Sequence, residues 1–194
     1  MYKAVIFDLN GVFLQSEPLS KRFEEKFGII KDLFLPALKE IMAVVRKPKC
    51  PAAFTLWKPY LAQWQVSLSE QQFFDFWFSG EHLVSELVEY ARGLRNGGVK
   101  VFILSNNFKE RTEFYRQNFP QIFQYVDKAY FSWETGFVKP SVESLQLVLS
   151  ENSLKPEDCI YFDDSDDNIK IAQDLGIKSE KWTNIDGAKK SVLK

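Results

Sequence analysis

The stretch AVIFDLNGV, residues 4–12, decides the fold. Four apolar residues run directly into Asp8, and Asn10 and Gly11 follow in what the residue types predict to be a polar turn. A short apolar run closed by a turn is typical of a strand buried on both faces, as in a parallel sheet. Asn10 lies two residues after the acid, where a second carboxylate would complete a pair of acids. An acid followed by an amide does not by itself indicate a reaction, so the chemistry of this turn must be inferred from residues elsewhere in the chain.

Apolar runs recur further along the chain and alternate with helical patterns. Strand-like runs lie at residues 99–106, 128–132 and 159–168, the last of which ends in four acids, and amphipathic helical patterns lie at residues 81–98 and 140–152. Strands that alternate with helices predict a parallel sheet with helices on both faces. The expected fold class is therefore α/β.

One long segment, residues 16–80, has a different pattern. It shows helical spacing of apolar residues and no convincing strand, and Ser69 with Gln72 predicts a capping box at the start of one of its helices. We therefore expect a core made of residues 1–15 and 81–194, with residues 16–80 inserted as a helical segment.

Composition excludes several classes of protein. The 194 residues carry 25 basic and 26 acidic side chains, a balance that does not favour nucleic acid as a partner. No apolar run is long enough to span a membrane, and the first residues do not resemble a signal peptide. Cys50 and Cys159 lack metal-ligand spacing and are expected to be free thiols. We predict a cytoplasmic protein that binds neither nucleic acid nor membrane, and we favour a monomer.

Polar residues follow the predicted strands at the point where each strand ends. Ligands of parallel α/β sheets bind at this edge, so these side chains are expected to converge. They are Asp8, Ser105, Asn106, Asp163 and Asp164, with Lys139 in the loop after the run at 128–132.

A group of carboxylates with a hydroxyl and an ammonium has a clear chemical use. Clustered carboxylates repel one another unless a cation lies between them, and oxygen ligands suit Mg²⁺. Mg²⁺, a lysine and a hydroxyl together can neutralise a phosphoryl group during its transfer. A carboxylate beside the metal can attack phosphorus and form an aspartyl phosphate.

Four motifs in this order resemble those of the haloacid dehalogenase (HAD) superfamily. They are FDLNGV at 7–12, FILSN at 102–106, GFVKPS at 136–141 and YFDDSDDNIKIAQDLGI at 161–177. The resemblance covers the whole chain and implies a Rossmann-like core. It also implies that residues 16–80 form a small helical cap over the site.

The resemblance further implies roles for the residues at the strand ends. Asp8 would be the nucleophile, and Ser105 and Lys139 would hold the phosphoryl group. Asn106 follows Ser105 and is a candidate to bind the phosphoryl group as well, the alternative being that it contacts the turn after Asp8. Mg²⁺ would be bound by Asp8, Asp164 and the main-chain carbonyl of Asn10. Asp163 would either contact the metal or support the residues that do.

Asn10 departs from the pattern of the superfamily's phosphatases. They carry an acid here that protonates the leaving oxygen and later activates water, whereas an amide cannot transfer that proton. Loss of a general acid–base typically costs ~10²–10⁴ in rate. We expect a Mg²⁺-dependent phosphatase or phosphotransferase, a phosphoric monoester hydrolase, that acts on a small phosphorylated metabolite through an aspartyl phosphate on Asp8. Its activity would be weakened by Asn10.

Other interpretations stay open. Asn10 could mark a pseudoenzyme that only binds a ligand or partner, or a replacement introduced into the chain. A 2-haloacid dehalogenase also lacks the second acid, but Asp163 and Asp164 would repel its carboxylate substrate. In the helical segment, FFDFWF at 73–78 is expected to pack helices together. Arg46, Lys47 and Lys49 are expected to form a solvated stretch, the alternative being that they reach the phosphate.

Overall fold

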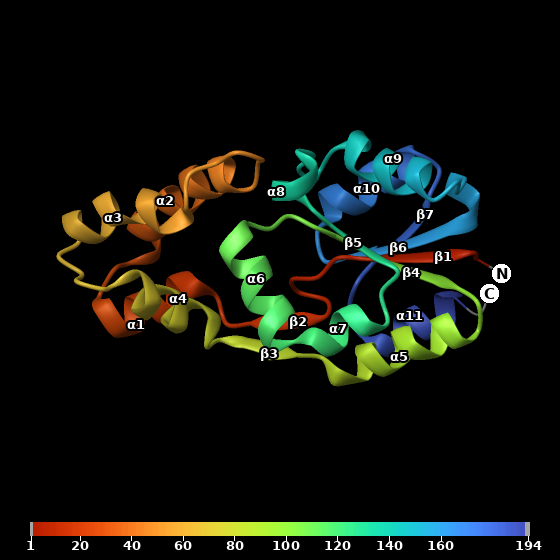
Figure 1. Cartoon of the computed structure of the whole chain (residues 1–194), viewed down its shortest axis with the longest axis horizontal. Helices are drawn as coiled ribbons and strands as arrows, with labels where there is room; N and C mark the ends of the chain where they lie inside the picture. The colour runs from red at the N-terminus through yellow and green to blue at the C-terminus, as the bar shows by residue number, and fades with distance from the viewer. Residues whose placement is uncertain (1, 193–194) are drawn as a thin grey trace.

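The computed structural model describes residues 2–192, and its centre is a parallel sheet of five strands in the order β5-β4-β1-β6-β7 (Figure 1). The α/β class with a parallel sheet is confirmed. β1 is the middle strand because it pairs with β4 on one side and β6 on the other. The strands are β1 Ala4–Phe7, β4 Lys100–Ser105, β5 Lys128–Phe131, β6 Cys159–Asp163 and β7 Lys178–Lys181.

Helices cover both faces of this sheet, as Figure 1 shows. Successive residues of a strand point to opposite faces. Val5 and Phe7 of β1 therefore join the core cluster that includes α5 and α11, whereas Ala4 and Ile6 join the one that includes α9 and α10. The helices of this part are α5 Ser85–Asn96, α6 Lys109–Asn118, α7 Pro120–Gln124, α8 Ser132–Thr135, α9 Val142–Glu151, α10 Asp166–Asp174 and α11 Ile185–Val192, with a 3₁₀ turn at Pro156–Asp158.

Four further helices form a separate unit beside the sheet. They are α1 Leu19–Phe27, α2 Lys31–Val45, α3 Ala53–Gln63 and α4 Glu70–Phe78. We call them the helical unit; in Figure 1 they lie to the left of the sheet. Its interior is aromatic: Phe23, Phe34, Trp57 and Phe73 are fully buried in one cluster. Residues 73–78 contribute to that cluster, so the packing interpretation is confirmed.

The chain leaves for the helical unit and returns through a two-stranded antiparallel ribbon. β2 (Leu14–Ser16) pairs with β3 (Glu81–Leu83). The helix predicted at residues 81–98 therefore begins later than expected, at Ser85. Local periodicity could not reveal this, because the partner of β3 lies more than sixty residues earlier in the chain. The capping box of Ser69 and Gln72 is confirmed at the start of α4.

No helix within residues 2–192 combines the length and apolar character needed to cross a membrane.

The aromatic cluster leads to a prediction about stability. Phe73 is fully buried and its ring meets those of Phe23, Phe54 and Trp57 at centroid distances of 5.3–6.1 Å. Phe73→Ala should lower the free energy of unfolding by ~3–5 kcal/mol because it leaves a cavity. Urea denaturation measures this. The matched control Phe137→Ala removes a phenyl ring that is 39% exposed, and should change the stability by less than ~0.5 kcal/mol. Equal losses would contradict the assignment of Phe73 to a packed core.

Candidate active site

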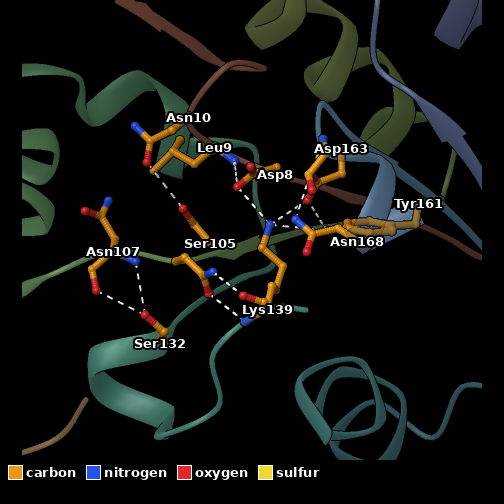
Figure 2. A network of polar contacts seen from close by, with 12 residues as sticks. Asp8, Leu9, Asn10, Ser105, Asn107, Ser132, Lys139, Tyr161, Asp163 and Asn168 are labelled. Atoms are coloured by element: carbon orange, nitrogen blue, oxygen red, sulfur yellow. Dashed lines mark hydrogen bonds and ion pairs between the residues drawn. The ribbon is translucent and has the colours of Figure 1, made fainter. Parts of the chain in front are cut away.

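Three neighbouring strands end at one small area and place polar side chains there. Asp8 directly follows β1, Ser105 is the last residue of β4, and Asp163 is the last residue of β6. Because β1 pairs with both other strands, these side chains lie at adjacent strand ends (Figure 2). Lys139, in the loop between α8 and α9, reaches the same area. The convergence expected from the sequence is therefore present for all four residues.

Lys139 lies between two carboxylates at the centre of the site. Its Nζ is 2.6 Å from Oδ2 of Asp163 and 3.1 Å from Oδ1 of Asp8. All three residues are buried. A buried charge is tolerated when it is paired, so each of these groups depends on the others. Figure 2 shows the lysine pointing between the two acids.

Asp163 has hydrogen-bond partners on both carboxylate oxygens. Oδ1 accepts from the backbone N–H of Ser165 and from the side-chain amide of Asn168, both at 2.9 Å. Oδ2 accepts from Lys139 and from the hydroxyl of Tyr161. Burial alone would raise the pKa of Asp163, but Lys139 and the other donors outweigh it and the pKa lies below its ordinary value. Asp163 is therefore a fixed anion that anchors Lys139.

Asp8 is held less completely than Asp163. Its Oδ1 accepts the backbone N–H of Leu9 at 2.6 Å and faces Lys139. Within residues 2–192, no donor bonds its Oδ2. Burial raises the pKa of Asp8 to about 6; Lys139 opposes this shift and the charge of Asp163 adds to it. One oxygen of Asp8 therefore remains available for an electrophile or a cation.

Asp164 completes an acidic cluster with Asp8 and Asp163. One carboxylate oxygen from each residue lies within 4.8 Å of the others. Burial and the charge of Asp163 raise the pKa of Asp164 above its ordinary value. Three carboxylates with one ammonium leave excess negative charge, which a divalent cation with oxygen ligands would offset. The donor set therefore fits a hard divalent cation.

The turn after β1 leaves room for this cluster only because it contains glycine. Gly11 has φ +84°, and a Cβ at this position would lie 2.2 Å from Oδ2 of Asp164. A side chain there would strain the backbone and collide with the acid. Gly11 therefore allows the first and fourth sequence motifs to approach closely.

Asn10 has a partner at each end of its amide. Its Nδ2 donates to the hydroxyl oxygen of Tyr115 at 2.6 Å, and the Ser105 hydroxyl donates to its Oδ1 at 3.5 Å. Burial raises the pKa of Tyr115 far above its ordinary value, so this hydroxyl keeps its proton. The amide is therefore fixed beside Ser105, at the edge of the acidic cluster.

Asn106 holds the backbone of Lys139. Its Nδ2 donates to the Lys139 carbonyl at 2.6 Å, and its Oδ1 accepts the Lys139 N–H at 2.8 Å. The next residue, Asn107, exchanges two backbone hydrogen bonds with the Ser132 hydroxyl, both at 3.1 Å. The turn after β4 is thus tied to the start of α8 and to Lys139 in the loop that follows α8.

Several residues of this network were not predicted from the sequence. Tyr161 lies two residues before Asp163, so strand periodicity places both on one face of β6. Asn168 belongs to the same acidic stretch, five residues after Asp163. These two could have been found. Tyr115 could not, because 105 residues separate it from Asn10 and nothing local marks it.

The position of Lys139 leads to a second prediction. Lys139→Met should lower the free energy of unfolding by ~3–5 kcal/mol at neutral pH, because it leaves two buried carboxylates without their cation. Without the lysine, burial raises both carboxyl pKa values above those of the unfolded chain, so the loss should grow as pH rises. Urea denaturation at several pH values tests this.

The control for this prediction is Lys181→Met, which removes an exposed ion pair with Asp166. This substitution should lower the free energy of unfolding by no more than ~1 kcal/mol, and the loss should change little with pH. A Lys139 variant that behaves like this control would contradict the buried triad.

Known proteins share this fold. A HAD family enzyme from Bacteroides thetaiotaomicron has a TM-score of 0.82 at 23% identity, covering 94% of each chain. The same enzyme has been solved in complex with magnesium and inorganic phosphate, and that structure has a TM-score of 0.77 at 22% identity, covering 94% of this chain and 95% of the other.

Curated relatives have low identity over most of the chain. The phosphorylated carbohydrates phosphatase of Thermotoga maritima is 26% identical over 192 residues, 91% of this chain and 82% of that protein. Bifunctional epoxide hydrolase 2 of Rattus norvegicus is 21% identical over an alignment of 200 residues that covers 90% of this chain. The chain spans 35% of the rat protein's length. The family model described as haloacid dehalogenase-like hydrolase matches residues 2–176. The chain therefore belongs to the haloacid dehalogenase-like hydrolase family.

Proposed function

We propose that this protein is a Mg²⁺-dependent phosphatase or phosphotransferase that acts on a small phosphorylated metabolite. The observation that carries the proposal is the arrangement of Asp8, Asp163 and Asp164 around Lys139 at the strand ends. The arrangement supplies a carboxylate nucleophile, ligands for a cation and an ammonium within one small volume. The phosphatase from Thermotoga maritima is a relative over nearly the whole chain, which supports the same chemistry.

The metal would be held by oxygen atoms of the acidic cluster. Asp8 and Asp164 are the main side-chain ligands in this proposal, together with the main-chain carbonyl of Asn10. Both oxygens of Asp163 already accept hydrogen bonds, so it supports the site mainly by anchoring Lys139. Bound Mg²⁺ would neutralise charge on the phosphoryl oxygens during transfer.

Asp8 would perform the transfer itself. Its Oδ2 would form a bond to phosphorus while the bond from phosphorus to the leaving oxygen breaks, and the leaving oxygen would keep the electron pair. Water would then attack the aspartyl phosphate at phosphorus and release phosphate and the free carboxylate. Ser105 and Lys139 would contact the phosphoryl oxygens, and Asn106 would keep the backbone of Lys139 in place.

Asn10 limits which phosphates can react quickly. An amide fixed between Tyr115 and Ser105 can orient a leaving group but cannot protonate it. The leaving oxygen must therefore take its proton from solvent. Phosphates whose leaving group is already stable as an anion, such as acyl or aryl phosphates, would suffer least.

The helical unit would act as a cap that controls access to Asp8. Residues 16–80 enter and leave through the β2–β3 ribbon, immediately after the turn that carries Asp8 and Asn10. The aromatic cluster of this unit also contacts Phe108 and Phe114, so movement of the unit on its two-stranded connection would separate these rings. In this proposal residues 1–15 and 81–194 form the catalytic core, and the cap selects the substrate.

A binding protein without catalysis is the second candidate, and Asn10 is the observation that favours it. Asp8, Ser105, Lys139 and Asp164 are nevertheless all present, and their contacts form a compact network. A site that had lost its function would not be expected to keep them all, so we place catalysis first.

Metal binding gives the third prediction. Asp164→Asn should weaken Mg²⁺ binding at least ~10-fold, because it removes a charged ligand. Asp167→Asn is the matched control, since this acid is exposed on α10 only three residues away. Calorimetric titration of both variants tests the assignment. Equal affinities in the two variants would exclude Asp164 as a ligand.

The same titration should depend on pH. Because the pKa of Asp8 is about 6, its carboxyl binds a proton in place of the metal in acid, and Mg²⁺ affinity should increase as pH rises through about 6. An affinity that does not change between about pH 5 and about pH 7.5 would contradict the role of Asp8 as a ligand.

The fourth prediction concerns turnover. Asn10→Asp should raise the rate of alkyl phosphate hydrolysis by ~10²–10⁴, because it supplies the missing general acid. The Tyr115 hydroxyl can donate to the new carboxylate and hold it in place. Phosphate release is measured with Mg²⁺ for the parent and the variant, with Asp8→Asn as the inactive control.

The results of this phosphate-release experiment distinguish the candidate functions. Release by both proteins supports a working phosphatase, and release by the variant alone supports the binding protein. Release by neither would overturn phosphoryl transfer, and halide release from a 2-haloacid would replace it with dehalogenation.

A further inference from the structure

Arg46 differs from the other cations of its segment. It directly follows α2, and Figure 1 shows that this end of α2 faces the sheet side of the molecule. The sequence suggested that Arg46, Lys47 and Lys49 are solvated together. Lys47 and Lys49 are exposed as expected, but Arg46 is partly buried, and its Nε is enclosed without a hydrogen-bond partner among residues 2–192. The expectation was therefore wrong for Arg46.

A cation in this position is unfavourable for the protein alone. The enclosed Nε of the guanidinium loses hydration, and within residues 2–192 no carboxylate forms an ion pair with Arg46 to compensate. Burial lowers the pKa of Arg46, the charge of Arg111 lowers it further, and Asp8 opposes both. The guanidinium is thus close enough to Asp8 and Arg111 for their charges to act on it.

Arg46 lines a cavity between the helical unit and the core. The cavity has a volume of about 170 Å³ and is also lined by Met42, Trp77, Glu81 and Arg111. This is room for about five water molecules at liquid density, or for a small organic fragment. Met42 and Trp77 make part of its wall apolar.

The charges around this cavity leave one positive charge uncompensated. Arg111 donates to Oε1 of Glu81 from Nε at 3.0 Å and from Nη2 at 2.5 Å, so these two cancel. Glu17, also on the wall, is paired with Lys21 at 2.5 Å. The remaining charge is that of Arg46. A ligand group with a single negative charge would balance it, and a carboxylate also matches the planar fork of a guanidinium.

Arg111 and Tyr115 connect this cavity to Asn10 at the edge of the acidic cluster. The guanidinium of Arg111 lies over the ring of Tyr115, 5.4 Å from its centroid, and the hydroxyl of Tyr115 accepts from Asn10. In the proposed reaction the leaving oxygen lies near Asn10. A leaving group that extends from Asn10 in the direction of Arg111 would approach Arg46.

We propose that Arg46 binds a carboxylate on the leaving group of the substrate, so that the preferred substrates are phosphate esters of hydroxy acids. This inference rests on the proposed phosphatase function and assigns to the helical unit a residue that determines specificity.

The test compares two esters that differ in one group. 3-Phosphoglycerate carries a carboxylate on its leaving group, and glycerol 3-phosphate carries a hydroxymethyl group instead. Hydrolysis is measured with Mg²⁺ in the parent, in Arg46→Gln and in Lys49→Gln, which removes an exposed charge three residues away. Binding of both esters is also measured by calorimetry in the Asp8→Asn background, where turnover is blocked.

Substitution of Arg46 is expected to affect mainly the ester whose leaving group carries a carboxylate. The parent should prefer 3-phosphoglycerate, and Arg46→Gln should reduce both kcat/KM and affinity for it ~10- to 100-fold, the usual worth of a hydrogen bond to a charged group. Glycerol 3-phosphate should change less than ~3-fold, and Lys49→Gln should behave like the parent with both esters. The melting temperature of Arg46→Gln should not fall, because the substitution removes an unpaired, partly buried charge.

Other results would overturn the inference. Equal losses with both esters would mean that Arg46 contacts the transferred phosphoryl group. Absence of any loss, or a selective loss only with a bisphosphate such as fructose 1,6-bisphosphate, would exclude a carboxylate site. Selective binding without hydrolysis would retain the site and reject the proposed phosphatase function, so the two failures are distinguishable.

Discussion

The buried ammonium of Lys139 is the constraint on which the rest of the site depends. It lies within 3.1 Å of two carboxylates that end neighbouring strands, and none of the three groups could be buried alone. The surrounding residues hold the lysine and the carboxylates in position. Asn106 fixes the backbone of the lysine, while Tyr161 and Asn168 hold Asp163 in place. Four segments that are distant in sequence are joined in this way at one edge of the sheet.

The same contacts give Asp163 and Asp8 different protonation behaviour. Asp163 has donors on both oxygens and a lowered pKa, so it is a permanent anion. Asp8 has one oxygen without a donor and a raised pKa, which is the state of a group that still needs an electrophile or a cation. The difference arises from position, because the donors of β6 and α10 converge on Asp163, whereas Asp8 lies in a turn with few donors of its own.

In the proposed function, Asn10 and Arg46 both concern the leaving group of the substrate. Asn10 is fixed beside Ser105 by Tyr115 and supplies no proton. Arg46 belongs to the helical unit and supplies a charge that the protein itself does not neutralise. Tyr115 and Arg111, both on α6, lie between them. In the proposed function, α6 would therefore connect the chemistry at the sheet edge with substrate selection by the helical unit.

The pattern of apolar and polar residues was enough to predict a parallel sheet, its strand ends and the residues Asp8, Ser105 and Asp163 that meet there. This was possible because buried parallel strands are apolar throughout, so that the first polar residue after each run marks the edge where Asp8, Ser105 and Asp163 meet. Only the tertiary structure decided the pairing of β2 with β3, the contact of Asn10 with Tyr115 and the enclosure of Arg46. Each of these joins residues far apart in the chain, and local periodicity carries no information about such contacts.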